Sequence, residues 1–411
     1  MTPPDLSPFD PARLEAIAER WDTPCYVYHE GLLRNTFQAF SSALEGRPHR
    51  LCYAVKANSS LAILSLFARM GAGFDIVSGG ELQRVLAAGG DAGSVVFSGV
   101  GKRADEIRLA LQAGILCFNV ESEAELLRID RIANEMGLRA PVSLRVNPDV
   151  DAGTHPYIST GLKTSKFGIA YDDALRLYQR AASLSGVRVV GIDCHIGSQI
   201  TEITPFIDAL DRILLLVDML TSVGIMLHHI DLGGGLGIRY HDESPPAIGD
   251  YVHAIRSRLD GRPQHVLLEP GRALVGNAGL LLTRVEYLKA GEERNFAIVD
   301  AAMNDLMRPA LYDAWHEIVP VRPRTAGRIN WEVVGPVCET GDFIGHERAL
   351  ALQEGDLLAI LSAGAYGMSM SSNYNSRPRA AEVLLRDNGE NWLMRERERI
   401  TMLYANEHIP D

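Results

Sequence analysis

Short apolar segments and amphipathic segments alternate along the first two thirds of the chain. Eight of the apolar segments are four to seven residues long and carry few polar positions on either face. Segments of this kind are typical of parallel strands that are covered on both sides. The eight predicted strands are Leu51–Val55, Phe74–Val77, Val95–Ser98, Cys117–Val120, Val142–Val146, Val189–His195, His228–Leu232 and Val266–Glu269.

Segments with a helical period lie between these strands, at Leu61–Met70, Gly80–Ala88, Ala104–Ala113, Glu121–Met136, Asp172–Leu184, Thr204–Val223 and Gly249–Leu259. A further helix pattern, Gly31–Leu44, precedes the first strand instead of following the last one. Strands and helices that alternate in this way predict an α/β fold, a closed TIM-like (β/α)8 barrel. A doubly wound open sheet is the alternative that the same pattern allows.

The alternation stops near Gly276, and strand patterns then follow one another directly. They cover Leu280–Leu288, Asn295–Val299, Trp331–Val334, Leu357–Leu361, Ala381–Arg386 and Trp392–Arg397. Such a run predicts an all-β second domain, an antiparallel barrel or sandwich. Thr23–Tyr28 could join it, whereas Val319–Arg328 is expected to be a loop and residues 399–408 a short terminal helix. We therefore expect a barrel domain over residues 31–275 and a β domain made of residues 1–30 and 276–411.

The composition is that of an ordinary globular protein with room for two domains, with 411 residues, 46% hydrophobic and 22% charged. No apolar run is long enough to span a bilayer, and the proline-rich, acidic residues 1–11 do not resemble a signal peptide. The net charge of −12 argues against nucleic acid as the main partner. Five scattered cysteines, four of them in strand-like contexts, indicate reduced thiols in a cytoplasmic protein.

A single lysine ends the first predicted strand, in the segment Tyr53-Ala54-Val55-Lys56-Ala57-Asn58. An unpaired buried ammonium is costly, so Lys56 must reach solvent or a partner. At the carboxyl end of a barrel strand it would face the mouth where such folds place active sites. Two interpretations remain open: a lysine on the barrel rim, or a Schiff-base lysine whose lowered pKa frees the amine to attack a carbonyl.

Polar and glycine-rich segments follow the sixth and seventh predicted strands. His195-Ile196-Gly197-Ser198-Gln199 places an imidazole where it can stack on a flat ring, or where local hydrogen bonds simply satisfy it. The glycines of Asp231–Gly237 let backbone N–H groups approach an anion, or form a tight turn. The segment has neither the Gly-Lys-Ser/Thr of a Walker loop nor a convincing dinucleotide fingerprint.

The segment Glu269-Pro270-Gly271-Arg272 follows the eighth predicted strand and opens an apolar helical turn. Loops after the seventh and eighth strands of such barrels often bind phosphate, so the two segments together predict a phosphate cradle. Glu269 would face the barrel interior, where a protonated pyridine nitrogen could pair with it. A lysine, a ring-stacking histidine, a phosphate cradle and a carboxylate together predict a pyridoxal 5′-phosphate site without a metal.

These segments resemble the fold type III, alanine racemase-like group of pyridoxal phosphate enzymes, and within it the diaminopimelate decarboxylase family. The resemblance extends over nearly the whole chain. It includes Asn119–Ser122, Arg145–Pro148, His155–Gly161, Lys166–Ile169, Met303–Tyr312, Gly335–Asp342 and Gly364–Asn375. The departures are mild: Val337, Thr340 and Ala302 replace residues that are more often isoleucine, serine and glycine, and no functional group is lost.

This resemblance implies that Lys56 binds the cofactor, His195 stacks on its ring and Glu269 pairs with its nitrogen. The residues expected around the phosphate are Ser198, Gly235, Gly271, Arg272 and Tyr366. Those expected at the distal end of the substrate are Arg272, Arg308, Tyr312, Glu339 and Tyr366. The implied reaction is decarboxylation of meso-2,6-diaminopimelate to L-lysine and CO2, the last step of lysine biosynthesis.

The resemblance also implies that Cys338 is the acid that returns a proton after CO2 leaves. It implies a head-to-tail homodimer, in which Cys338 and Glu339 act on the partner's cofactor. These roles suit a substrate that is zwitterionic at both ends, because an arginine and a glutamate can hold the end that does not react. A substrate without that end would leave both groups unpaired.

Several other functions share parts of this pattern. Decarboxylases of ornithine, arginine or carboxynorspermidine have the same fold, but their substrates lack a distal carboxylate for Arg308 and Tyr312. An alanine racemase needs a tyrosine base where this chain has Cys338. A non-catalytic regulator would be expected to have lost Lys56 or Cys338. Residues 147–171 form a long predicted loop, which we expect to be a lid over the site.

Overall fold

The computed structural model describes residues 5–151 and 166–410, and the chain forms two compact units. One, here called the barrel unit, contains residues 36–237 and 245–273. The other, the β unit, contains residues 1–35, 238–244 and 274–411. The domain boundaries expected at residues 30 and 275 remain a prediction. None of the described helices combines the length and the apolar character that crossing a membrane requires.

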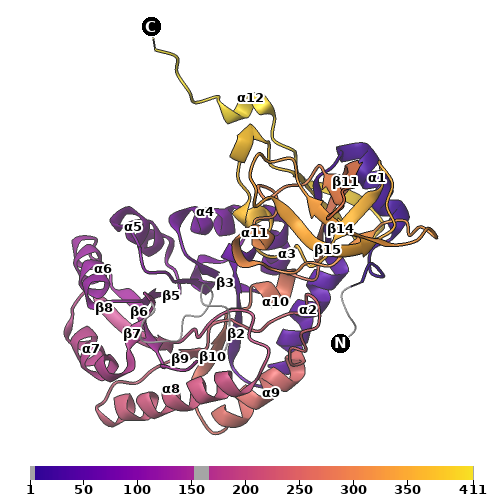
Figure 1. Ribbon diagram of the computed structural model, residues 1–411. Coiled ribbons are helices and arrows are strands. Elements are labelled where there is room, and N and C mark those ends of the chain that lie inside the picture. Colours follow the sequence, from indigo (N-terminus) through magenta and orange to yellow (C-terminus); the bar gives the residue numbers. More distant parts are fainter. Residues whose placement is uncertain (1–4, 152–165, 411) are drawn as a thin grey trace. The chain divides into compact units, whose positions relative to one another are not determined.

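Eight parallel strands close into a ring in the barrel unit, which confirms the predicted (β/α)8 fold (Figure 1). Closure comes from the pairing of the last strand with the first. A two-residue strand, β7 (Ile169–Ala170), pairs with β6 beside the ring. The ring consists of β2 (His49–Ala54), β3 (Gly73–Ile76), β4 (Val95–Phe97), β5 (Cys117–Val120), β6 (Ala140–Asn147), β8 (Val187–Asp193), β9 (His229–Asp231) and β10 (His265–Leu268).

Helices lie outside this ring and cover its strands (Figure 1). Their apolar residues recur at helical spacing: in α7, for example, Ala174, Leu177, Tyr178 and Ala181 are buried. Serine caps start two of them, since Ser78 and Ser122 each accept a hydrogen bond from a backbone N–H three residues on. The helices are α2 (Glu30–Ala43), α3 (Leu61–Arg69), α4 (Gly79–Ala87), α5 (Ala104–Ala113), α6 (Glu123–Glu135), α7 (Tyr171–Ser183), α8 (Thr204–Ser222) and α9 (Ile248–Leu259). A short helix, α10 (Arg272–Val275), follows β10 at the carboxyl end of that strand.

The β unit is built on one mostly antiparallel sheet. Its N-terminal strand, β1 (Cys25–His29), lies between β11 and β17, so the segment 23–28 does join the second domain. The β1–β17 and β12–β14 pairs are parallel, so the sheet is not antiparallel throughout. The other strands are β11 (Gly279–Lys289), β12 (Phe296–Val299), β13 (Ile318–Pro320), β14 (Ile329–Val334), β15 (Phe343–Leu350), β16 (Leu357–Ile360), β17 (Ala381–Leu385) and β18 (Asn391–Arg395).

Three short or amphipathic helices complete the β unit: α1 (Pro11–Trp21), α11 (Arg308–Tyr312) and α12 (Ile400–Leu403). The terminal helix is therefore shorter than the predicted 399–408. Two strands, β13 and β15, were not predicted, and β13 takes the first residues of the supposed loop Val319–Arg328. Most of the expected lid, residues 152–165, lies outside the described residues, so that prediction stays open.

The buried His229 ring packs so closely against Gly191 that a single methyl group at this position should destabilise the barrel. A Cβ added at Gly191, in β8, would lie 2.0 Å from Nε2 of the buried His229. We expect Gly191→Ala to lower the free energy of unfolding by about 1–3 kcal/mol, because the ring cannot move away without disturbing the core. A Cβ added at Gly249, in the first turn of α9, would have no atom within 4 Å beyond its chain neighbours and the backbone of its own helix. Gly249→Ala should therefore be neutral or slightly stabilising in the same chemical denaturation experiment.

His229 also predicts how the stability of the barrel depends on pH. Burial is the main cause that lowers its pKa to about 3, below the ordinary 6.5, so the folded protein holds it neutral. The unfolded chain takes up this proton below pH 6.5, and stability is therefore lost as the pH falls from 6.5 towards 3. We expect the stability difference between wild type and His229→Gln to narrow by up to about 1.4 kcal/mol per pH unit in this range. A constant difference in denaturation at pH 7, 6 and 5 would contradict this.

Candidate functional site

The lysine around which the site was predicted lies at the carboxyl end of β2. It belongs to a single 3-10 turn, Val55–Ala57, rather than to the strand itself. The turn is held by the Tyr53 hydroxyl, which donates to the Asn58 carbonyl at 2.8 Å. The Lys56 Nζ donates to Oδ2 of Asp75 at 2.8 Å, and about a third of its side chain is exposed. Lys56 is thus neither a freely solvated rim residue nor a buried cation without a counter-charge.

Asp75 was not predicted as a site residue. It lies in β3, and its side chain is completely buried. One carboxylate oxygen accepts from Lys56, and the other has no hydrogen-bond partner among the described residues. A lone carboxylate within an otherwise apolar barrel strand was the signal in the sequence, since such a group is rarely buried without a function or a partner.

His195 follows β8, and its ring is held in the neutral form. Its Nδ1 accepts a hydrogen bond from the Gly234 N–H at 3.2 Å. Burial, together with the positive charges of Arg145 and Lys56, lowers the pKa of His195 well below 6.5. A neutral imidazole is suited to packing against the face of a flat ring, and the stacking role of His195 stays a prediction.

The loops after β8, β9 and β10 come together at one place. An isolated bridge joins Ile200 to Leu236, and Arg272 Nη2 donates to Ser198 Oγ at 3.1 Å. Gly235 has a φ of +113°, and a Cβ added there would lie 2.6 Å from the Gly197 carbonyl oxygen. The predicted phosphate residues of the barrel unit, Ser198, Gly235, Gly271 and Arg272, therefore sit on adjoining loops. Here only glycine permits such close backbone approach.

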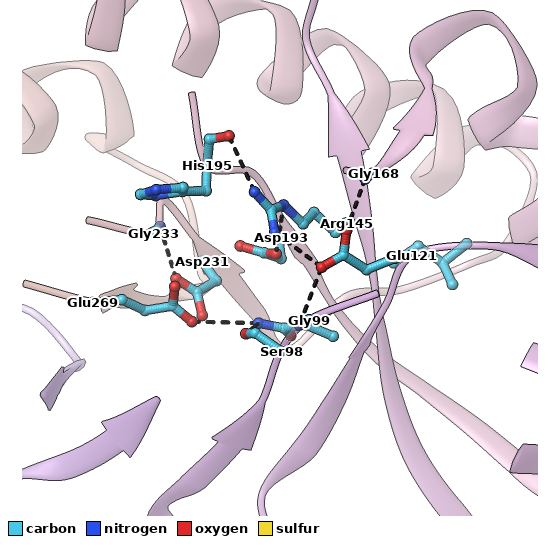
Figure 2. A network of polar contacts seen from close by, with 12 residues as sticks. Ser98, Gly99, Glu121, Arg145, Gly168, Asp193, His195, Asp231, Gly233 and Glu269 are labelled. Carbon is cyan, nitrogen blue, oxygen red and sulfur yellow. Dashed lines mark hydrogen bonds and ion pairs between the residues drawn. The ribbon is translucent and has the colours of Figure 1, made fainter. Parts of the chain in front are cut away.

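Three carboxylates meet inside the barrel mouth, from Asp193, Asp231 and Glu269 (Figure 2). One oxygen of each lies within 4.8 Å of the others, and all three side chains are buried. Burial and the neighbouring carboxylates raise the pKa of Glu269 well above 4.5, and burial is the main cause that raises the pKa of Asp231 to about 6. Among the described residues, no lysine or arginine lies within ion-pair distance of Glu269. The cluster therefore favours a cationic or N–H donor ligand.

The neighbours of this cluster fix its members in place. Asn119 donates to Glu269 Oε1 at 3.3 Å and to Ser98 Oγ at 3.1 Å, while the Gly233 N–H donates to Asp231 at 2.9 Å. Three carboxylates could also hold a hard cation. The same oxygens suit a protonated ring nitrogen equally well.

Arg145 is the positive centre of an adjoining network (Figure 2). Its guanidinium is paired with Glu121 at 2.9 Å and lies 3.9 Å from Asp193, and it also reaches the His195 carbonyl. Glu121 in turn accepts from the N–H groups of Gly99 and Gly168. The network ties the ends of β4, β5, β6 and β8 together. Arg145, Glu121 and Gly168 lie within segments that carried the family resemblance, but no role was predicted for Arg145 or Glu121.

The remaining predicted residues belong to the β unit. Arg308 and Tyr312 are the first and last residues of α11, one turn apart, and the Arg308 side chain is buried. Cys338 is exposed, and its backbone N–H donates to Asn375 Oδ1 at 2.8 Å. Glu339 accepts from the Tyr374 hydroxyl at 3.2 Å. Tyr366 has a φ of +56°, which is uncommon for a residue with a Cβ.

The five cysteines are all free: Cys25, Cys52, Cys117 and Cys194 are buried, and only Cys338 is exposed. Burial raises the pKa of the Cys25 thiol to about 12. It also raises the pKa values of the other three buried thiols well above 9. Thiols of this kind are chemically inert. Cys338 is therefore the accessible thiol of the chain.

The chain is similar to known proteins both in sequence and in structure. The family model described as "Pyridoxal-dependent decarboxylase, pyridoxal binding domain" matches residues 30–276. The chain is 61% identical to a diaminopimelate decarboxylase of Pseudomonas aeruginosa, over 96% of this chain and 95% of that protein. It is 56% identical to one of Vibrio cholerae, with the same coverage. A crystal structure of diaminopimelate decarboxylase from Helicobacter pylori complexed with L-lysine is similar, with a TM-score of 0.93 and 42% identity over 96% of this chain and 99% of that one.

Proposed function

Because the chain belongs to the family of pyridoxal-dependent diaminopimelate decarboxylases, we propose that it removes one carboxylate of meso-2,6-diaminopimelate as CO2 and releases L-lysine. This is the last step of lysine biosynthesis. Three observations agree: the family match, the identity to named relatives over almost the full length, and the barrel-mouth residues. The observation that carries the proposal is the pair of residues in the barrel mouth: Lys56 offers an amine, and the buried carboxylate of Glu269 would be stabilised by a cationic ligand.

The described residues of the barrel unit fit pyridoxal 5′-phosphate. When bound, this cofactor supplies a conjugated ring that takes up the electrons left by the departing CO2. Lys56 offers an amine for the aldehyde group, with Asp75 as its counter-charge. Glu269 would hold the proton on the ring nitrogen. Burial raises the pKa of Glu269 because its negative charge is poorly solvated, and a protonated ring nitrogen beside it would stabilise that charge. We therefore assign the carboxylate cluster to the cofactor ring and not to a metal.

His195, Ser198, Gly235, Gly271 and Arg272 complete this assignment, with Tyr366 from the β unit. The imidazole of His195, held neutral, would pack against the ring face. The hydroxyl of Ser198 and the guanidinium of Arg272, already 3.1 Å apart, would share the phosphate with backbone N–H groups of the glycine loops.

The substrate's distal end would be bound by residues with complementary charge. Arg308 and Tyr312 would bind the distal carboxylate, joined by Arg272 and Tyr366, and Glu339 would bind the distal ammonium. Cys338 would donate its thiol proton to the carbon that has lost CO2. Substrates without a distal carboxylate would forgo the contacts that Arg308 and Tyr312 offer to that group, and they should be rejected strongly.

The test is CO2 release from three substrates offered separately: meso-diaminopimelate, ornithine and arginine. We expect release from meso-diaminopimelate alone, together with one L-lysine per CO2. If the protein shows the cofactor's absorbance but releases no CO2 from diaminopimelate, the cofactor assignment stands and the substrate assignment is wrong. Equal release from ornithine would show that Arg308 and Glu339 do not select the distal end.

We also propose that the chain forms a head-to-tail homodimer in which Cys338 and Glu339 serve the partner's cofactor. Lys56→Ala and Cys338→Ala should each be inactive alone. If residues from two chains complete each site, re-associated mixtures of the two variants should recover about a quarter of the wild-type activity. Recovery of none would show that both residues act within one chain. The four buried free thiols support a reducing, cytoplasmic setting.

A further inference from the structure

The side chain of Arg308 is held from two directions within the β unit. Its guanidinium carbon lies 4.4 Å from the centroid of the Tyr240 ring, in cation–π geometry. Its Nη1 lies 2.8 Å from Nε2 of His316, at hydrogen-bond distance. A long, flexible side chain is thereby restricted to one orientation, and it loses less conformational entropy when it binds an anion.

The partners of His316 fix the proton on its ring. Its Nδ1 lies 2.8 Å from the Leu361 carbonyl oxygen, which can only accept, so Nδ1 carries the hydrogen. Its Nε2 faces the guanidinium of Arg308, which can only donate, so Nε2 is the acceptor. The imidazole is therefore neutral, and it is completely buried.

The main chain at His316 is fixed as well. Its carbonyl oxygen accepts from Arg348 Nη2 at 3.1 Å, and the Arg348 guanidinium stacks on Trp315. The Tyr240 ring also meets the His316 ring edge to face, with centroids 5.2 Å apart. Arg308 thus rests on a rigid neutral support.

A neutral support has a chemical consequence. An aspartate or glutamate at position 316 would also hold the guanidinium, but it would cancel much of its charge. An imidazole acceptor orients Arg308 and leaves its positive charge in place. That is the arrangement required of an arginine that must bind a carboxylate from outside the protein.

We propose that His316 is a positioning residue that orients Arg308 for the distal carboxylate of the substrate and so sets both affinity and selectivity for that end. The inference rests on the role given to Arg308 in the proposed function. It extends that role to a residue that does not itself touch the substrate.

Two substitutions of similar size separate positioning from simple structural support. In His316→Gln the longer amide can place its oxygen near the Nε2 position and still accept from Arg308. In His316→Asn the shorter amide can still donate to Leu361 but cannot reach Arg308. Both remove the same buried ring, so a purely structural role would affect the two variants alike.

We expect His316→Asn to raise KM for meso-diaminopimelate by about 10- to 100-fold, the usual effect of losing a hydrogen bond to a charged group, with kcat changed less than about threefold. His316→Gln should stay within about fivefold of wild type in KM. Calorimetric binding of L-lysine, which keeps the distal carboxylate, should weaken by the same factors. Arg308→Leu should raise KM at least as much, and the Arg308→Leu/His316→Asn double variant should be no worse than Arg308→Leu alone.

The outcomes distinguish the inference from the proposed function. If Arg308→Leu leaves KM and L-lysine binding unchanged, the role of Arg308 itself is wrong. If Arg308→Leu acts as expected but His316→Asn and His316→Gln are equivalent, or the double variant shows additive losses, His316 does not act through Arg308. Thermal unfolding of each variant, with the cofactor bound, shows whether a change in KM comes from lost stability instead of from the orientation of Arg308.

Discussion

Lys56→Ala should release CO2 from meso-diaminopimelate at least about 10⁴-fold more slowly than wild type. The amine is the group in the barrel mouth that can attach the cofactor through its aldehyde, and alanine offers no replacement. The cofactor's visible absorbance should also disappear, because that band depends on its bond to the lysine. Parallel absorbance and CO2 measurements check both effects.

Two control variants separate chemistry from folding in this experiment. Lys56→Arg retains a positive charge beside the buried Asp75, so the barrel keeps its counter-charge while the nucleophile is lost. It should fold and remain as inactive as Lys56→Ala. Lys289→Ala, at the exposed end of β11, should behave as wild type. Substantial turnover by Lys56→Ala would remove the lysine from the mechanism.

Glu269→Gln should lower kcat by about 10²- to 10³-fold while the cofactor stays bound. Glutamine has the same shape and can still accept from Asn119, but it has no charge to hold a proton on the ring nitrogen. The ring would then be a poorer acceptor for the electrons that CO2 leaves behind. Steady-state kinetics with the cofactor absorbance recorded alongside are the measurement.

Glu135→Gln is the matched control for this change, since Glu135 ends α6 and its exposed carboxylate pairs with Arg131 at the surface. It should leave kcat within about twofold of wild type, as expected of a surface substitution. An undiminished kcat in Glu269→Gln would show that the buried carboxylate does not control the ring nitrogen. If Glu269→Gln no longer binds the cofactor, the role of Glu269 is to bind the cofactor and not to promote catalysis.

The barrel could be predicted from sequence because its strands are buried on both faces. Segments such as Val95-Val96-Phe97 are apolar throughout, and their boundaries in the structure differ from prediction by two residues at most. The closed ring was predicted because eight such strands alternate with helices. Such a signal needs no knowledge of distant contacts.

The β unit was predicted less completely, and β15 shows why. Its centre, Gly345-His346-Glu347-Arg348, is polar, and Glu347 has a φ of +53°, so the alternation of a regular strand is interrupted. Arg348 is nevertheless buried, because it stacks on Trp315 and donates to His316. Contacts between residues more than thirty positions apart decide this strand, and local patterns do not contain them.

The candidate site divides in the same way. Lys56, His195, Ser198 and Glu269 follow barrel strands, and the sequence placed each of them correctly at a carboxyl end. Asp75 and Asp193 lie in strands, where a lone carboxylate signals a buried charge but offers no spacing that would assign it a role. His316 had no signal at all, since its function depends on the fixed direction of its two ring nitrogens.

Reductive trapping identifies the lysine that holds the cofactor. Treating the holoenzyme with sodium borohydride fixes the cofactor to whichever lysine holds it, and mass spectrometry of the digested protein then locates the added mass. We expect one phosphopyridoxyl group per chain, on the peptide that contains Lys56, and none in Lys56→Arg. A cofactor trapped on another lysine, or an active enzyme with no trapped cofactor, would contradict it.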